Sequence, residues 1–133
     1  RLIPQGNLMR HEWAAKAADQ LGVVVVLKGH ETFVVTPEEP SGGRLIVKVT
    51  SPTSWLATAG TGDVLAGIIA AIVATHSVKR VPSLQELAEL AATGVFLHGK
   101  AAEHAAEGGP FPALDVAESV SPVIAALSGE ADR

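Results

Sequence analysis

Small and apolar residues recur at helical spacing near the start of the chain. Between Leu8 and Leu21 they fall every three or four positions, as on one buried face of a helix. Asn7 precedes this run and its side chain can cap a helix, while Gly22 can end one in a left-handed conformation. We therefore expect a helix over residues 8–21.

Three strand patterns follow this helix. Val23 to Leu27 is a continuous apolar run rich in β-branched residues, the pattern of a strand buried on both faces. A second short strand is expected over Thr32 to Val35. After a turn-forming stretch rich in Pro, Gly and Glu, Arg44 to Val49 alternates apolar and polar residues. That alternation predicts a strand with one face in water.

The second half of the chain has the pattern of three helices. A loop rich in Gly, Ser and Thr opens into an apolar helix from about Val64 to His76. Ser83 and Glu86 form a capping-box pattern, which predicts a long helix that reaches about Glu107. A similar pattern predicts the last helix from Asp115 to about Leu127.

The order of elements is one helix, three strands and three helices, with no internal repeat or linker. We expect residues 1–133 to form one α/β domain, in which a strand leads through a loop into a buried helix. The chain starts at Arg1 rather than Met, and we expect it to be a piece of a longer protein.

Composition excludes several functional classes. The 133 residues include 10 Lys or Arg and 14 Asp or Glu, which gives a net charge of −4, and 4% are aromatic. Such a chain is a poor nucleic-acid binder, because neutralised phosphates and stacked bases supply that affinity. Without cysteine there is no disulfide, cysteine zinc site or thiol nucleophile. The longest apolar stretch, Val64 to Ala74, is too short to span a membrane, and Arg1 to Arg10 lack the apolar core of a signal peptide.

The segment Gly60-Thr61-Gly62-Asp63 carries candidate chemistry. Its two glycines let the backbone approach a ligand closely, and its amides lie just ahead of a helix, where a phosphate is favoured. Asp63 has two interpretations. It is either the cap of the following helix or a base that takes a proton from a hydroxyl while the amides stabilise a phosphoryl group.

A second candidate is Lys28, which follows the expected strand Val23 to Leu27. A lysine at the end of a buried strand can lean over a ligand at that edge of the sheet. The alternative is a lysine whose stem lies along apolar surface while its amine stays in water.

Two motifs together resemble the ADP-dependent NAD(P)H-hydrate dehydratases, a family of the ribokinase-like superfamily. These motifs are VVLKGHET at residues 25–32 and ATAGTGDVLAG at residues 57–67, with VFLHG at residues 95–99 similar to the helix that follows in the family. The resemblance implies a ribokinase-like doubly wound sheet with flanking helices. Family members are considerably longer, so the chain would be the carboxyl-terminal part of that domain.

The resemblance also implies site residues. Asp63 would face the hydrated nicotinamide ring as the catalytic group, and no residue is assigned to a metal. His30 and Glu31 occupy positions that vary in the family, so we expect backbone contacts there. The residues implied to bind the nucleotide are Lys28, Gly29, His30, Glu31, Thr32, Gly60, Thr61 and Gly62.

The implied reaction is the dehydration of NADH-hydrate or NADPH-hydrate in the cytoplasm. A phosphoryl group from ADP or ATP, with Mg²⁺, passes to the ring hydroxyl and leaves with elimination. The resemblance further implies a homo-oligomer, a tetramer, and an epimerase domain upstream in the full-length protein. The alternatives are a small-molecule kinase of the same superfamily and a non-catalytic nucleotide-binding fragment.

The histidines show no metal-binding spacing. His98 and His104 are six residues apart, on different faces of a helix, and there is no H-E-x-x-H motif. We interpret them, with His11 and His76, as surface or packing residues. Trp55 precedes the glycine-rich motif and either packs at the rim of the core or walls the site.

Overall fold

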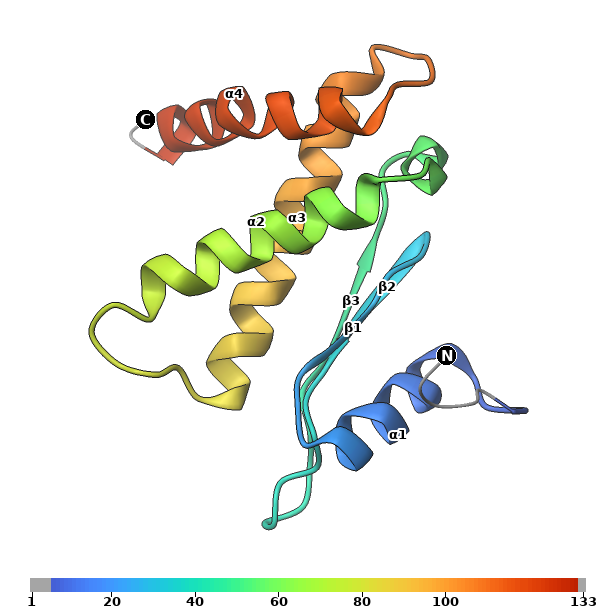
Figure 1. The fold of residues 1–133 in the computed structure, drawn as a ribbon, viewed down its shortest axis with the longest axis vertical. Helices are drawn as coiled ribbons and strands as arrows, with labels where there is room; N and C mark the ends of the chain where they lie inside the picture. Colours follow the sequence, from blue (N-terminus) through green and yellow to red (C-terminus); the bar gives the residue numbers. More distant parts are fainter. Residues whose placement is uncertain (1–5, 132–133) are drawn as a thin grey trace.

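The computed structural model describes residues 6–131, and its elements follow the expected order (Figure 1). The expectation that residues 1–10 carry no signal peptide falls partly on residues 1–5, outside the described chain. The elements are α1 (Arg10–Leu21), β1 (Val25–Leu27), β2 (Glu31–Val35), β3 (Ile46–Thr50), the 3₁₀ helix η1 (Ser54–Ala57), α2 (Thr61–His76), α3 (Leu84–Ala106) and α4 (Ala113–Ala131).

The three strands form one antiparallel sheet in the order β1-β2-β3. Val34 in the central strand pairs with Val26 on one side and Val47 on the other. The chain therefore has a mixed α/β fold around a three-stranded antiparallel sheet. The expected strand over Val23 to Leu27, buried on both faces, is wrong in two respects. The strand begins at Val25 and is only partly buried, because β1 is an edge strand with a single neighbour.

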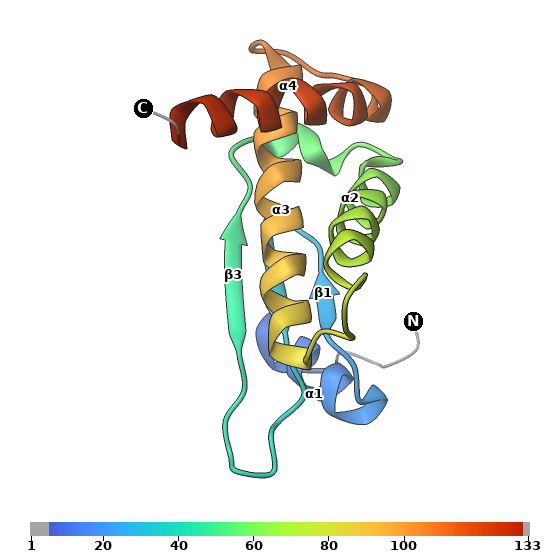
Figure 2. The same cartoon turned by 90° about the vertical axis from the view of Figure 1, so that its left-hand side faces the viewer.

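Helices cover both faces of the sheet, with α2 and α3 on one side and α1 on the other (Figure 2). Alternate residues of β2 belong to opposite layers. Phe33 and Val35 pack against Ala14 and Ala18 of α1. Val34 faces the other layer, where α2 and α3 lie. The period-two alternation of this strand thus divides the apolar residues between two cores. The second core contains Val34, Leu65, Ala88, Ala91 and Val95.

Helices α2 and α3 pack closely where α3 has a glycine. A Cβ on Gly94 would lie 2.6 Å from Cγ1 of Ile69, so the absence of a side chain allows this approach. Beyond that contact, α4 crosses the end of α3 and encloses a third apolar cluster with Leu56, Phe111 and Val116 (Figure 1). That cluster supports η1, which lies next to the start of α2.

Helix starts differ from expectation where the cap lacks a side-chain signal. α1 begins at Arg10 rather than Leu8, because Glu12 accepts a hydrogen bond from the Met9 N–H at 2.9 Å and Asn7 is not the cap. Its end at Gly22, with φ 66°, is confirmed. α2 begins at Thr61, three residues earlier than expected.

The capping box of α3 is confirmed, with mutual hydrogen bonds between Ser83 and Glu86. α4 starts at Ala113 rather than Asp115 and continues past Leu127, with Pro122 inside it. Within residues 6–131, no helix combines the length and the apolar character needed to cross a bilayer.

Candidate functional site

The turn between β1 and β2 lies at the same end of the molecule as η1 and the start of α2 (Figure 1). A cleft of about 260 Å³ opens between that turn and the segment that follows β3. Segments far apart in sequence therefore build one site. The lining residues are Lys28, Gly29, His30, Ser51, Thr53, Ser54, Leu56 and Ala57.

Lys28 connects the cleft to the first residue of α2. Its Nζ donates to the carbonyl oxygen of Leu56 at 2.8 Å and to Oγ1 of Thr61 at 3.2 Å. Partial burial lowers the pKa of the Lys28 amine. The amine therefore contacts both η1 and the first residue after Gly60, while the expectation that Lys28 leans over a ligand stays a prediction.

Thr61 shapes the loop from beneath. It is fully buried, and its hydroxyl lies 2.8 Å from the carbonyl oxygens of both Leu56 and Thr58. Its N–H donates to Thr58 at 3.4 Å. The Thr61 hydroxyl, expected to contact a nucleotide, is thus used in hydrogen bonds within the protein.

The two glycines of the motif have different roles. Gly60 caps α2 with φ 86°, a left-handed conformation that favours glycine, and a Cβ there would lie 3.1 Å from Cβ of Ala113. Gly62 lies in the first helical turn, where a Cβ would be 3.9 Å from Cδ of Lys28. Among the described residues, no acceptor receives the Gly62 N–H. This exposed amide beside a lysine can bind an anion.

Asp63 is the third residue of α2, and its side chain is exposed. Because Gly60 is the cap and no side chain caps α2, the interpretation of Asp63 as the helix cap is wrong. The carboxylate instead stands in the first turn, on the same loop as the exposed Gly62 amide. A group in this position can take a proton from a bound hydroxyl.

The remaining predicted residues belong to the β1–β2 turn. The buried Thr32 hydroxyl bonds both the N–H and the carbonyl oxygen of Gly29, at 3.2 and 3.1 Å, and so fixes the turn. His30 is exposed and its carbonyl oxygen accepts from the Ser51 N–H at 2.7 Å. The Glu31 carboxylate pairs with Lys48 on β3 at 2.8 Å. Lys28, Gly29 and His30 therefore line the cleft, whereas Thr32 supports it.

Sequence reasoning missed several residues of the site. Ser51, Thr53 and Ser54 line the cleft, although only their Ser- and Thr-rich composition marked the segment as a loop. Trp55 is 45% exposed on η1 and does not line the cleft. His98, interpreted as a surface or packing residue, is buried, and its Nε2 lies 2.8 Å from the carbonyl oxygen of Thr61. The signal available in the sequence was its spacing of three or four residues from the small residues Gly94 and Ala101, which places it on the same buried face of α3.

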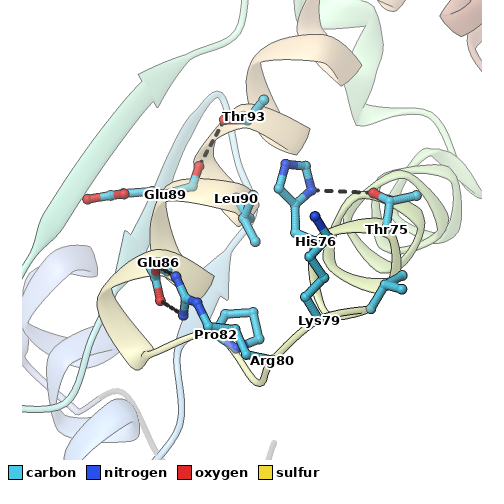
Figure 3. Close-up of a pocket in the computed structure, with 10 residues that line it drawn as sticks. Thr75, His76, Lys79, Arg80, Pro82, Glu86, Glu89, Leu90 and Thr93 are labelled. Atoms are coloured by element: carbon cyan, nitrogen blue, oxygen red, sulfur yellow. Dashed lines mark hydrogen bonds and ion pairs between the residues drawn. The ribbon is translucent and has the colours of Figure 1, made fainter.

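A larger cavity, of about 710 Å³, lies away from this chemistry, between the end of α2 and the start of α3 (Figure 3). Arg80 on its wall pairs with Glu86, and the lining also includes one lysine, Lys79, and one further acid, Glu89. Because the acidic and basic residues on the wall of this larger cavity balance one another, we place the candidate site at the glycine-rich loop and Lys28 instead. Over residues 6–131, no three His, Asp or Glu side chains are grouped to hold a metal ion.

Comparisons with known proteins bear on the family of the chain. A family model described as NAD(P)H-hydrate dehydratase matches residues 2–120. An ADP-dependent (S)-NAD(P)H-hydrate dehydratase of Neisseria meningitidis is 39% identical over 101 residues, 76% of this chain and 30% of that protein. A second protein of that name, from Bacillus subtilis, is 31% identical over 108 residues, 76% of this chain and 33% of its own length.

A longer relative is the bifunctional NAD(P)H-hydrate repair enzyme Nnr of Mycobacterium leprae. It is 40% identical over 96 residues, which are 71% of this chain and 18% of that protein. The chain thus spans between 18% and 33% of the length of these three relatives. No solved structure matches it significantly. Since the family model covers most of its residues, this chain belongs to the NAD(P)H-hydrate dehydratase family.

Proposed function

We propose that the protein containing this chain dehydrates NADH-hydrate or NADPH-hydrate with ADP or ATP as phosphoryl donor. The observation that carries the proposal is the Lys28 amine held at the start of α2, next to the Gly62 N–H, which has no acceptor within residues 6–131. A cation and a helix-start amide at one place favour a phosphate. The relatives named ADP-dependent (S)-NAD(P)H-hydrate dehydratase support the same nucleotide.

The described residues fit a nucleotide at this loop. Gly62 has no Cβ to keep a phosphate from its amide, and Lys28 supplies positive charge. The cleft beside them, lined by Gly29 and His30, would take the AMP portion. The buried Thr32 then acts by holding the turn, and Glu31 acts through its backbone, because its carboxylate is paired with Lys48.

Asp63 is the proposed catalytic residue. When bound, the nucleotide would transfer its terminal phosphoryl group to the ring hydroxyl and leave as AMP or ADP. The phosphate is a better leaving group than hydroxide, and its loss together with a proton from the neighbouring ring carbon would form the double bond that restores the reduced cofactor. Asp63 accepts the hydroxyl proton as the oxygen attacks phosphorus. Lys28 and the Gly62 amide stabilise the charge on the transferred group.

The described residues do not build a Mg²⁺ site. Asp63 is an exposed carboxylate at the loop, and no second acidic side chain is grouped with it and a third ligand. Magnesium commonly binds through substrate phosphates and water with one or two carboxylates. We therefore assign no residue to Mg²⁺ and no step to it.

We further propose that the antiparallel sheet is part of a larger, doubly wound ribokinase-like sheet. β1 has a neighbour on one side only, and a longer sheet would continue from its open edge. The short span relative to the relatives is consistent with this. The bifunctional name of one relative supports an additional, epimerase domain in the longer protein. A homotetramer in the cytoplasm stays a prediction.

The test compares two aspartates at the same helical position. Asp63 is the third residue of α2 and Asp115 the third of α4. In the full-length protein, Asp63→Asn should abolish the recovery of reduced-cofactor absorbance from hydrated NADH and leave ADP affinity intact, whereas Asp115→Asn should retain both. Nucleotide consumption without recovery would identify a kinase instead. Binding without any turnover in the unmodified protein would identify a non-catalytic nucleotide-binding protein.

A further inference from the structure

His98 is a buried, titratable side chain that the proposed reaction does not use. It lies on α3 with 2% of its surface exposed, and its Nε2 is 2.8 Å from the carbonyl oxygen of Thr61, 37 residues away. Since a carbonyl oxygen only accepts, Nε2 carries the hydrogen and donates it. Burial lowers the pKa of His98, against the opposing effect of the Thr61 hydrogen bond, and the charge of Lys28 lowers it further.

The carbonyl that His98 holds belongs to the peptide unit that ends in the Gly62 N–H. A peptide unit is planar and trans, so its C=O and N–H point in opposite directions. A donor that fixes the Thr61 carbonyl toward α3 therefore directs the Gly62 N–H away from α3. That N–H has no acceptor in the described chain, and the Lys28 stem lies beside the same residue.

The side-chain hydroxyl of Thr61 is held by contacts other than the one that holds its carbonyl. Its hydroxyl bonds Leu56 and Thr58 and accepts from Lys28 at 3.2 Å. The side chain and the carbonyl of one buried residue are thus fixed by different elements. The hydroxyl contacts locate the residue, and His98 holds the carbonyl of the following peptide from outside α2, in addition to the helical hydrogen bonds of the first turn.

We propose that His98 is a positioning residue that orients the Thr61–Gly62 peptide so that the Gly62 N–H faces the bound phosphate. This inference rests on the proposed nucleotide site. His98 itself is buried behind the loop and touches no ligand.

The test uses the full-length protein that contains this chain, with ADP as the probe. His98→Leu removes the donor and keeps an apolar residue of similar bulk, whereas His98→Gln places an N–H at a similar reach. His104→Leu, at an exposed position on the same helix, is the matched control. We expect His98→Leu to weaken ADP binding about tenfold, as for the loss of one well-aligned hydrogen bond, with His98→Gln within about twofold of the unmodified protein.

The Gly62 amide resonance separates positioning from general support of the fold. It should shift on adding ADP to the unmodified protein and to His98→Gln, and fail to shift in His98→Leu although that variant melts cooperatively. Equal ADP affinity and an equal Gly62 shift in His98→Leu would overturn the inference while leaving the proposed function intact.

Two further outcomes are decisive. Should His98→Leu not fold, His98→Asn, one methylene shorter than His98→Gln, replaces it, and equal ADP affinity of the Asn and Gln variants would overturn the inference. Should the unmodified full-length protein bind no ADP, the proposed nucleotide site fails. The role of His98 is then tested on the Gly62 amide resonance without ligand. We expect His98→Leu to shift this resonance and His98→Gln to leave it in place, and an unshifted resonance in His98→Leu would overturn the inference.

Discussion

Lys28 combines a positive charge with partial burial, and this combination has opposite effects on affinity and on stability. Burial lowers its pKa below the usual 10.5, so the site loses its charge at a lower pH than a surface lysine would. ADP affinity should therefore fall as pH rises toward 10.5. The free energy of unfolding should rise over the same range, because the unfolded chain binds that proton more tightly.

Calorimetric titration with ADP between about pH 8 and pH 10.5 measures the first effect. Lys28→Arg keeps its charge throughout this range and should flatten the dependence. Lys48→Arg, on the surface of β3, is the control and should leave the slope in place. An unchanged slope in Lys28→Arg would remove Lys28 from the site.

The two motif glycines should separate binding from folding. A Cβ on Gly62 meets only the Lys28 stem, at 3.9 Å, so Gly62→Ala should leave the melting temperature equal or higher, with a gain of up to about 1 kcal/mol. It should weaken ADP binding at least tenfold by keeping the phosphate from the amide. Gly60→Ala should instead destabilise the fold by about 1–2 kcal/mol, because φ 86° is strained for alanine and Ala113 lies 3.1 Å away. Unfolding curves and ADP titrations of both variants check this, and a Gly62→Ala chain with normal affinity would contradict the site.

At the scale of elements, the start of α3 is held by a small electrostatic cluster. The pKa of Glu86 is lowered from 4.5 to about 2. The main cause is its hydrogen-bonded ion pair with Arg80, and the hydrogen bonds with Ser83 contribute less. A carboxyl with a lowered pKa stabilises the folded state above its unfolded pKa, and this contribution is lost as pH falls from 4.5 toward 2. Glu86→Gln should therefore lower stability at neutral pH and reduce the loss of stability over that acid range.

Urea unfolding at neutral pH and at several acid values tests this expectation. Glu103→Gln, farther along the same helix, controls for removing one negative charge. A Glu86→Gln chain as stable as the unmodified chain at neutral pH would show that the cap does not depend on this carboxylate.

The same elements explain how far sequence reasoning reached. The α3 cap was predictable because Ser83 and Glu86 carry the signal in their side chains, within four residues. The start of α2 was not, because Gly60 caps it by backbone conformation alone. β1 was misjudged because a β-branched run does not show how many neighbours a strand has. The two motifs predict Lys28 and Gly62 as site residues, but the contact of His98 with Thr61 depends on how α3 packs on α2.

For the whole molecule, the two ends of α2 offer two different places for a ligand. The cleft beside Lys28 is the smaller, and the cavity with Arg80 is the larger. We expect ADP to slow hydrogen exchange over residues 28–30 and 60–63, and to leave residues 75–93 unchanged. Exchange measured by mass spectrometry on peptides from these segments checks the expectation. Protection confined to residues 75–93 would move the nucleotide to the other end of the helix.

The half-exposed Trp55 gives this site an optical reporter. It is one of two tryptophans, and the other, Trp13, lies on α1 across the sheet. The carbonyl oxygen of Leu56, the residue after Trp55, accepts a hydrogen bond from Nζ of Lys28. A ligand that draws the lysine toward a phosphate loosens that contact, and the indole emission would record the change. Arrival and departure of a nucleotide could thus be timed by stopped-flow fluorescence without a label, with Trp13→Phe removing the background signal.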